Sequence, residues 1–437
     1  MAYTATVTKL TNIRPHPNAD KVKLATVFGN QVVIGLNNTE SELGLYFQVD
    51  GQLSEEFCKM NNLFRNPELN NDPKEKPGMF DENRRIRAQK FRGEVSDGFW
   101  IPISSVSYIN GLELTDGLDF TSLGGHLICE RYITKQTRTA GAGGGKTAKS
   151  ANKSIMFKEH FDTAHLGKNL HRLELGQRLV ITAKLHGTSS RVGRVQVNRT
   201  LTWKDKLSKF IGGLVSANHY AYLNGTRRTV INESKYKQPF HDPSIRDQAA
   251  KLFEGKLHKG ETVYLEIVGY EPSGAPIMGR ADTTKMNDKA FTAKYGKVIT
   301  YSYGCEEKTC DFYVYRITMT NEDGIAIDLP WDDLVSRCNT LDVKHVPLIA
   351  ITTLDSFLTM DGDVESARQS FMSYIDKLCS RPCSIDPRHI EEGVCVSIDN
   401  LRITPAVFKH KSFEFKVLEG IVKDSGVIDQ EEVEDIA

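Results

Sequence analysis

One segment of the sequence has the composition of a linker rather than of a folded core. Residues 135–154, KQTRTAGAGGGKTAKSANKS, are dominated by Gly, Ser, Thr and Lys and show no apolar periodicity. A stretch of this composition is typical of a flexible linker. We therefore predict a basic linker over residues 131–155. The length of 437 residues, which exceeds one typical core, also favours two folded parts or more.

The part before this linker, residues 1–130, consists of short β-type runs separated by turn residues. The turns read HPNAD, GN, NNTE and DG, and the candidate strands between them are ATVTKL, KLATVF, QVVIG, GLYFQV and FWIPI. Several short strands without long helices are typical of a small β-barrel. We predict such a barrel for residues 1–130.

The part after the linker, residues 156–425, mixes helices with hydrophobic strands. The stretch VESARQSFMSYIDKL predicts a helix whose apolar residues lie on one side, namely Val364, Ala367, Phe371, Ile375 and Leu378. The remaining residues, 426–437, are strongly acidic, and we expect them to form a disordered tail.

Composition narrows the class of protein. Lys+Arg and Asp+Glu number 56 each, so any surface for a nucleic acid must be a local patch. The chain has no run of about 18 apolar residues and no signal-peptide core near its start, which argues against a membrane or secreted protein. Eight scattered cysteines favour reduced thiols, and together these features predict a cytoplasmic location.

Several charged residues lie in or beside apolar strands. The strand LVITAK ends at Lys184, and a glycine follows three residues later. Glu266 lies within the apolar strand TVYLEIVGY, where a carboxylate is costly to bury without a partner. Glu392 leads into the strand GVCVSI. Lys409 and Lys411 are two residues apart, so a strand would present both to the same side.

Each of these residues also has an ordinary structural interpretation. Lys184 could be a solvated residue at a strand end, Glu266 a carboxylate at the rim of a sheet, and Tyr315 part of the core. Lys409 and Lys411 could belong to a solvated strand face. Their order along the chain favours a functional interpretation instead: Lys-x-x-Gly, a strand Glu, an aromatic strand, Glu-Gly-Val and Lys-x-Lys.

This order resembles the covalent nucleotidyltransferase superfamily of DNA ligases, RNA ligases and mRNA-capping guanylyltransferases. The matching stretches are 184–187 for motif I, the surroundings of Glu266 for motif III, 312–317 for motif IIIa, 392–394 for motif IV and 409–411 for motif V. His186, with Thr188 and Ser189 after the glycine, is similar to the RNA-ligase form of motif I. The chain thus resembles ATP-dependent RNA ligases in which an OB-like domain precedes the ligase domain.

The resemblance implies a role for each matching residue. Lys184 would be the nucleophile, and Lys409 and Lys411 would hold the α-phosphate of ATP. The nucleotide site would also include Leu185, His186, Gly187, Glu266 and Tyr315, where Tyr315 stacks on the base. Glu266 and Glu392 would hold Mg²⁺ or Mn²⁺. Either Arg191 or Arg199 could supply the arginine of motif Ia, and Arg199 is favoured because it ends a strand.

The proposed nucleophile imposes a condition on its own protonation. A lysine attacks only as the neutral amine. We therefore expect the pKa of Lys184 to be lowered, both by burial and by the nearby charges of Lys409 and Lys411.

Two N-terminal stretches carry a second resemblance. IRPHPNADKVKLATV and RAQKFRGEVSDGFWIP are similar to tRNA-binding OB domains. Arg87, Lys90 and Arg92 are therefore candidate RNA contacts, although a solvated loop would have the same composition. The expected fold class is α+β: an OB-like β-barrel, followed by an ATP-grasp-like DNA/RNA ligase adenylation domain of antiparallel sheets with flanking helices.

The expected function follows from both resemblances. The chain would use ATP and a divalent cation to join the 3′-OH and 5′-phosphate ends of nicked or broken RNA, in nick sealing or RNA repair. A DNA ligase and an mRNA-capping guanylyltransferase are the alternatives among enzymes. The alternative outside the enzymes is an RNA-binding protein that contains a degenerate ligase domain.

Overall fold

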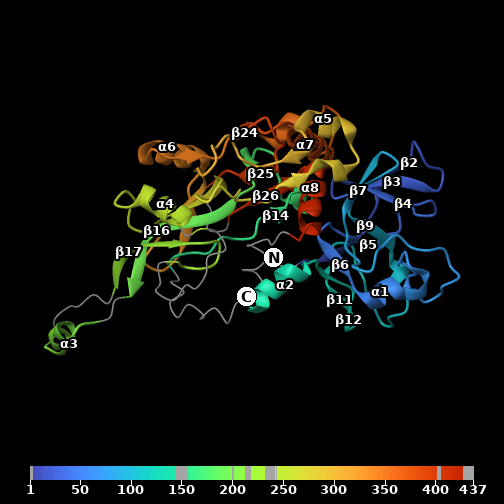
Figure 1. Ribbon diagram of the computed structural model, residues 1–437, viewed down its shortest axis with the longest axis horizontal. Coiled ribbons are helices and arrows are strands. Elements are labelled where there is room, and N and C mark those ends of the chain that lie inside the picture. Colours follow the sequence, from blue (N-terminus) through green and yellow to red (C-terminus); the bar gives the residue numbers. More distant parts are fainter. Residues whose placement is uncertain are drawn as a thin grey trace. The chain divides into compact units, whose positions relative to one another are not determined.

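The computed structural model describes residues 3–143, 156–198, 201–211, 218–231, 242, 244–400 and 405–426. They belong to two compact units (Figure 1). The first unit contains Met1–Lys135 together with Ser412–Gly426, and the second contains Gln136–Lys411. Most of the expected linker and nearly all of the expected acidic tail lie outside the described residues. Within the expected linker, Lys135–Gly143 form helix α2.

The first unit is built from short strands, and the five runs predicted from the sequence are all strands. Its main antiparallel sheet has the order β10-β1-β5-β9, and a second sheet has the order β2-β3-β4. The strands are β1 (Ala5–Lys9), β2 (Thr11–Pro15), β3 (Val22–Val27), β4 (Asn30–Gly35), β5 (Leu43–Phe47), β6 (Gly51–Leu53), β7 (Ala88–Phe91), β8 (Glu94–Asp97), β9 (Phe99–Pro102), β10 (Asp119–Phe120), β11 (Ser122–Leu123), β12 (His126–Leu127) and β13 (Cys129–Arg131). The helical segments are α1 (Glu55–Met60) and the 3₁₀ turns Pro67–Leu69 and Ile103–Val106.

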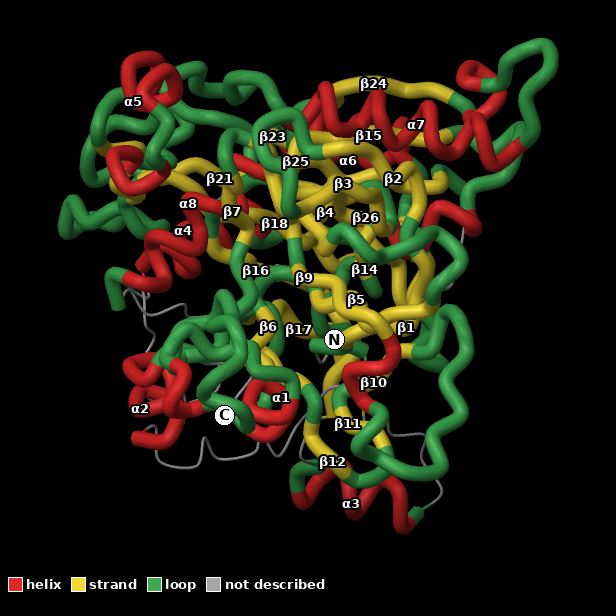
Figure 2. Tube along the Cα trace, turned by 90° about the vertical axis from the view of Figure 1, so that its right-hand side faces the viewer, coloured by secondary structure: helices red, strands yellow, loops and turns green. Residues whose placement is uncertain are grey.

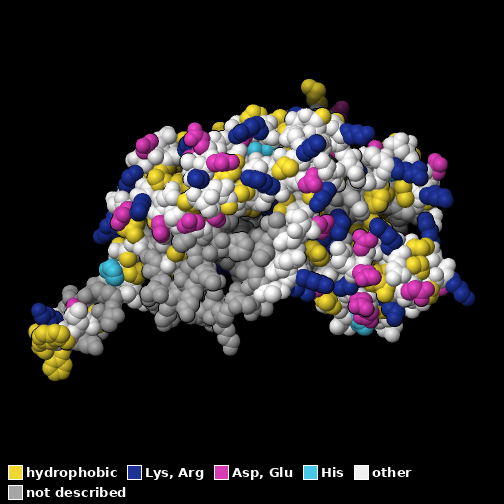
Figure 3. Space-filling view, viewed as in Figure 1, with side chains coloured by type: hydrophobic (Ala, Val, Ile, Leu, Met, Phe, Trp, Pro, Cys, Tyr) yellow, Lys and Arg dark blue, Asp and Glu magenta, His cyan; other side chains and the backbone are white. Residues whose placement is uncertain are grey.

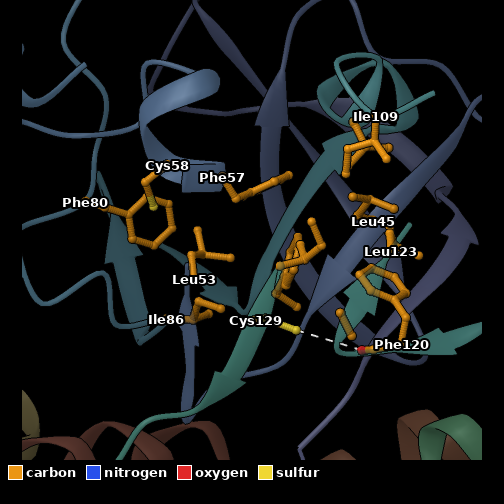
Figure 4. Packing of buried hydrophobic residues seen from close by; sticks show 14 of the residues in the cluster. Leu45, Leu53, Phe57, Cys58, Phe80, Ile86, Ile109, Phe120, Leu123 and Cys129 are labelled. Atoms are coloured by element: carbon orange, nitrogen blue, oxygen red, sulfur yellow. Dashed lines mark hydrogen bonds between the residues drawn. The ribbon is translucent and has the colours of Figure 1, made fainter. Parts of the chain in front are cut away.

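The core of this unit lies beneath its main sheet and α1 (Figure 4). Leu45 and Phe47 of β5 and Phe57 of α1 are fully buried in it. The thiol of Cys129 contacts the carbonyl oxygen of Phe120 at 3.8 Å, so β13 closes onto β10. The apolar residues of β3 and β4 fill a second buried cluster, together with Tyr46 of β5 and Trp100 of β9.

Helix α8 (Phe413–Asp424) belongs to the first unit although it follows the last strand of the second. Ser412 caps it, because its hydroxyl accepts a hydrogen bond from the Phe415 amide at 3.1 Å. Phe415 and Leu418 are buried. The predicted ligase domain extends to residue 425, but the second compact unit ends at Lys411 because α8 contacts β7 of the first unit.

Ion pairs in which the cation is buried hold α8 in the first unit. Arg85 Nη1 donates to Asp424 Oδ1 at 2.7 Å, and the Arg85 side chain is only 2% exposed. Its Nη2 lies 3.3 Å from Asp50 Oδ1, which also lies 3.2 Å from Lys423 Nζ. Another buried pair joins α8 to β8 and consists of Lys416 and Asp97.

The second unit contains two large sheets and the two-stranded sheet β19-β20. The first has the order β14-β26-β25-β15-β24 and the second β17-β16-β18-β21-β22, with β23 beside β21. The strands are β14 (Ala164–His165), β15 (Leu179–Lys184), β16 (Thr188–Asn198), β17 (Asn218–Gly225), β18 (Glu261–Gly269), β19 (Ala281–Asp282), β20 (Val298–Ile299), β21 (Cys310–Thr320), β22 (Ala326–Asp328), β23 (Lys344–His345), β24 (Leu348–Thr352), β25 (Gly393–Ile398) and β26 (Val407–Lys411).

Besides α2, the helices of the second unit are α3 (Trp203–Phe210), α4 (Ser244–Phe253), α5 (Lys289–Tyr295), α6 (Trp331–Leu341) and α7 (Val364–Cys379), with 3₁₀ turns at Gly167–Arg172, Thr283–Met286 and Leu354–Phe357. Of these, α4, α6 and α7 contact the two large sheets, as the expected α+β class requires. The predicted helix over 364–378 is α7. Its Ala367, Phe371 and Ile375 are fully buried in a core shared with β15 and β25. Figures 1 and 2 both show α7 beside this sheet.

Two further observations bear on the class of protein. All eight cysteines are free thiols. Within the described ranges, no helix is long and apolar enough to cross a membrane.

Candidate functional site

The first group of predicted site residues, 184–187, lies where the chain passes between the two large sheets of the second unit. Strand β15 ends at Lys184 in one sheet and β16 begins at Thr188 in the other, so three residues make the passage. At the last of them, Gly187, a Cβ atom would collide with the carbonyl oxygen of Ile267 in β18. The Gly187 amide donates to Glu266 Oε1 at 3.1 Å. A glycine is required here because the chain passes directly against β18.

Lys184, Glu392 and Lys411 converge from neighbouring strands. Lys184 and Lys411 both pair in register with Gly393, one from each side of β25. The side chain of Glu392 is only 2% exposed, and its Oε1 lies 2.7 Å from Lys184 Nζ and 3.3 Å from Lys411 Nζ. A Cβ atom at residue 393 would collide with the carbonyl oxygen of His410. The absence of a side chain at Gly393 therefore lets β25 and β26 approach closely beside the carboxylate.

The pKa of Lys184 is raised, opposite to the expected lowering. Burial of the amine is the largest influence and lowers its pKa, but Glu392 and weaker acidic neighbours together raise it by more. In turn, burial raises the pKa of Glu392, but Lys184 and Lys411 lower it by more. In the protein without ligands, Lys184 is thus a charged partner of Glu392. It must lose this partner before it can act as a nucleophile.

The expected lowering occurs at Lys409 instead. Burial lowers the pKa of Lys409 to about 8, and the charges of Lys411 and Lys184 add to the effect. Lys409 lies on β26 opposite Cys395, two residues before Lys411. The two late lysines therefore differ, since Lys411 contacts Glu392 and Lys409 is desolvated among cations.

Glu266 holds the backbone that follows Lys184. Besides accepting the Gly187 amide, it accepts the Ser189 hydroxyl at its Oε2 at 3.3 Å. It is the one residue of β18 that is not fully buried. The structure thus brings Glu266 to the start of β16, next to the connection that begins at Lys184.

Tyr315 lies at an irregularity of β21. Leu265 pairs with Val314 and Tyr264 with Arg316, so Tyr315 is the extra residue of a β-bulge opposite β18. Its hydroxyl lies 3.3 Å from His160 Nδ1, and the two rings are 5.5 Å apart. His160 had no distinguishing signal in the sequence.

The sequence also did not indicate Tyr303, which holds the backbone of His186. The Tyr303 hydroxyl accepts a hydrogen bond from the His186 amide at 2.6 Å. The imidazole of His186 lies 4.9 Å from the ring of Tyr301, and Tyr303 in turn packs 4.7 Å from the ring of His389. These residues come from stretches with no recognisable pattern, so only tertiary packing reveals them.

Of the two candidate arginines, only Arg191 can be placed, because Arg199 lies outside the described residues. Arg191 is 2% exposed, and its Nη1 donates to the carbonyl oxygen of Phe157 at 3.1 Å. Its guanidinium carbon lies 4.4 Å from the centre of the Phe157 ring. In this structure Arg191 therefore supports the segment that precedes β14.

The carboxylates also fit a divalent cation. The described residues contain no group of three or more His, Cys, Asp or Glu that could hold a metal ion. Glu392 Oε2, however, is buried, accepts no hydrogen bond from any described residue, and lies 4.0 Å from His186 Nδ1. Magnesium is commonly held by one or two carboxylates together with waters and substrate phosphates. Glu392 meets that description, with Glu266 as the second carboxylate.

The candidate RNA contacts of the first unit have structural partners. Arg87 Nη2 lies 3.6 Å from Asp424 Oδ2. Arg92 lies in the turn between β7 and β8, where its Nη1 donates to the carbonyl oxygen of Asn18 at 3.2 Å. Asn18 Nδ2 donates back to the Arg92 carbonyl at 3.0 Å. The two stretches that resemble tRNA-binding OB domains thus meet in space, and Lys90 lies on β7 beside them.

Two family models match the chain. One is described as RNA ligase and matches residues 177–417. The other is described as an OB-fold domain and matches residues 4–103. None of the curated proteins searched matches the sequence.

The structure is similar to solved structures of the RNA ligase from Naegleria gruberi. A lysine-to-alanine variant with ATP and Mn gives a TM-score of 0.56 at 17% identity, covering 94% of this chain and 98% of that one. The ligase with PPi gives 0.54 at 16% identity, covering 94% and 97%. A lysine-to-methionine variant with AMP and Mn gives 0.55 at 16% identity, also covering 94% and 97%. At these identities the likeness shows a common fold.

Proposed function

The chain belongs to the RNA ligase family and carries an OB-fold domain ahead of its ligase domain, and on this premise we propose that it joins RNA ends with ATP. The substrates would be an RNA 3′-OH and an RNA 5′-phosphate. The observation that supports the proposal most directly is the meeting of Lys184 and Lys411 at one carboxylate oxygen of Glu392. A lysine held at the start of an intersheet connection, among further lysines, suits attack on a polyphosphate.

The first proposed step is self-adenylylation. The neutral amine of Lys184 attacks the α-phosphorus of ATP, a P–N bond forms, the bond to the β-phosphate breaks, and pyrophosphate leaves with the bonding electrons. Lys409 and Lys411 would hold the α-phosphate as negative charge increases in the transition state. An arriving phosphate would also compete with Glu392 for the lysines. This competition would free Lys184 from the contact that raises its pKa.

Two transfers would complete the cycle. An oxygen of the RNA 5′-phosphate attacks the phosphorus of the bound AMP, and the P–N bond breaks with return of the amine to Lys184. The RNA 3′-OH then attacks the adenylylated 5′-phosphate, a phosphodiester forms, and AMP leaves with its electron pair. Positioning and charge stabilisation would supply most of the catalysis, as in phosphoryl transfer generally.

Glu392 and Glu266 are the residues that would hold Mg²⁺ or Mn²⁺. The buried Oε2 of Glu392, which accepts no hydrogen bond from the described residues, is suited to a cation. When bound, the cation would offset the charge of the phosphates and of Glu392. Tyr315 would stack on the adenine, and Leu185, His186 and Gly187 would line the nucleotide. Arg199 stays the favoured candidate for motif Ia.

The test replaces Lys184 in two ways. Lys184→Ala removes the amine, and the matched variant Lys184→Arg keeps a cation beside Glu392 that cannot attack at neutral pH. Both variants should fold but form no covalent adduct with labelled ATP, and both should fail to seal a 5′-phosphorylated nick. Lys184→Ala should still seal RNA that already carries a 5′-adenylyl group, because that step needs no lysine nucleophile.

Two outcomes would contradict the proposal. A covalent ATP adduct in both variants would show that another residue is the nucleophile. Labelling of the wild-type protein by GTP rather than ATP would indicate a guanylyltransferase.

A further inference from the structure

Helix α3 exposes a group of large apolar side chains. Trp203, Leu207, Phe210 and Ile211 are 70%, 52%, 87% and 75% exposed. Their spacing of four, three and one residues places them on one face of the helix. No other stretch of nine residues within the described ranges contains as many exposed large hydrophobic residues. Apolar residues gathered in this way usually mark a binding surface.

The start of this helix is defined by its own sequence. The Thr202 amide donates to Asp205 Oδ2 at 2.8 Å, and the Asp205 amide donates to the Thr202 hydroxyl at 3.3 Å. This reciprocal pair is a capping box, which satisfies amides that the helix itself cannot. The single acidic residue of the helix is therefore used by the cap, and the exposed apolar face is part of a defined helix.

The charge around α3 points to an anionic partner. Residues 199–211 contain four lysines and arginines but only one acidic residue, Asp205, whereas the whole chain is balanced at 56 each. Three of the four are Lys204, Lys206 and Lys209 of α3 itself. Figure 3 shows hydrophobic and basic side chains next to each other on α3, at the lower left of the view. A polyanion is the complementary ligand for such a segment.

The aromatic residues identify which part of a nucleic acid fits. Bases stack on aromatic side chains only where they are unpaired, because a duplex covers their faces. Trp203 and Phe210 are seven residues apart, which corresponds to roughly 10 Å along a helix axis. A stacked strand advances about 3.4 Å per nucleotide, so this separation corresponds to about three nucleotides. Lys204, whose Nζ lies 5.8 Å from the centre of the Trp203 ring, can reach a phosphate of this strand.

We propose that α3 binds unpaired nucleotides of the RNA substrate, so that the enzyme prefers breaks with a single-stranded flank to fully paired nicks. The inference rests on the proposed function and names its substrate class. Strand β16 begins directly after Gly187, and its 11 residues span about 36 Å before α3 begins. The nucleotides on α3 are accordingly remote from the reacting phosphate, and they select the substrate without entering the chemistry.

The experiment compares two substrates that contain the same nick. One is fully paired, and the other carries an unpaired flank of about ten nucleotides on one side. The full-length variant Trp203→Ala/Phe210→Ala should bind the flanked RNA at least about tenfold more weakly, since stacking on each aromatic residue contributes about this factor. Its affinity for the paired nick should change less than twofold. Adenylylation by ATP should be unchanged.

Two control variants separate stacking from loss of apolar surface. Trp203→Phe/Phe210→Tyr keeps both aromatic rings and should retain the affinity for the flanked RNA. Leu358→Ala/Met360→Ala removes two exposed apolar side chains elsewhere and should affect neither substrate. Equal losses for both substrates, or no loss for the flanked one, would overturn the proposal.

Two further measurements examine other occupants of the helix face. The wild-type protein could bind phosphatidylglycerol vesicles through Trp203 and Phe210 while the variant Trp203→Ala/Phe210→Ala keeps its affinity for RNA. This result would assign α3 to a membrane and overturn the proposal. If the wild-type protein is a dimer that the same substitutions convert to a monomer, again with unchanged RNA affinity, α3 binds a second copy of the chain. This result would also overturn the proposal. Aromatic-dependent RNA binding in a protein that fails to react with ATP would refute the proposed ligation and leave the docking role supported.

Discussion

Buried charges are arranged differently in the two units of the molecule. In the first unit, Arg85, Lys416 and Lys423 face an equal number of carboxylates, those of Asp50, Asp97 and Asp424. In the second unit, Lys184 and Lys411 share one oxygen of Glu392. Lys409 has no salt-bridge partner among the described residues, and its pKa is lowered to about 8 by burial and by the neighbouring lysines.

The difference separates structural charges from charges that await a ligand. A balanced buried pair fixes how two segments fit together, whereas an excess of one sign is costly unless a counter-charge arrives. A polyphosphate would supply that counter-charge in the second unit. Perturbed lysines beside a partly neutralised carboxylate are therefore a stronger indication of a binding site than buried charge alone.

The largest effect on stability is expected at the balanced pairs. Lys416→Met leaves the buried carboxylate of Asp97 beside an apolar side chain and should reduce the free energy of unfolding by about 3 kcal/mol, as for other broken buried pairs. Urea unfolding measures the loss. The matched control Arg65→Met breaks the exposed Arg65–Asp81 pair and should cost less than about 1 kcal/mol. Equal losses in the two variants would show that burial does not distinguish these pairs.

At the unbalanced site, removing a charge should stabilise the protein. The folded-state pKa of Lys409 is about 8, below the ordinary 10.5, so its charge is disfavoured in the folded state. That penalty is complete below pH 8 and disappears as the pH rises toward 10.5, so wild-type stability should increase over this window. At pH 7, Lys409→Met should raise the free energy of unfolding by up to about 3 kcal/mol while sealing activity falls.

Thermal unfolding of both proteins from pH 7 to 10.5 tests this expectation. The variant should lack the increase in stability that the wild type gains above pH 8. A variant that is less stable than the wild type at pH 7 would contradict the assignment of Lys409 as a destabilising charge.

The smallest effect is expected for an uncharged contact of the same site. Tyr303→Phe deprives the His186 amide of its acceptor and should cost about 1–2 kcal/mol, seen as a several-fold slower adenylylation at saturating ATP. The control Tyr108→Phe removes a buried hydroxyl that has no partner among the described residues and should leave the rate unchanged. A Tyr303 variant with wild-type rate would show that this contact does not position His186.

The sequence predicted the elements better than the contacts between them. The strands of the first unit were predictable because turn residues delimit each apolar run. The meeting of Lys184 with Glu392 and Lys411 followed only from a resemblance in motif order. The direction of the Lys184 pKa was predicted wrongly, because burial and Lys411 lower this pKa but Glu392 and weaker acidic neighbours raise it by more.

Helices were harder to assign than strands where their partners are distant in the chain. Lys135–Gly143 form α2 in a stretch whose composition favoured a linker. The chain after Lys411 was assigned to the ligase domain because it follows the last motif. Its ion pairs with Asp50, Arg85 and Asp97 place it instead in the first unit, and local sequence contains no signal for that choice.

The position of α8 has a consequence for how this protein is made and dissected. The first unit includes the helix that follows Lys411. During translation, this unit therefore cannot be completed until the whole ligase domain has been synthesised. Cutting away residues 1–130 alone would remove Asp50, Arg85 and Asp97, and would leave α8 on the remaining fragment without the partners of Lys423, Asp424 and Lys416. A clean separation of the two units has to remove both ends of the polypeptide together.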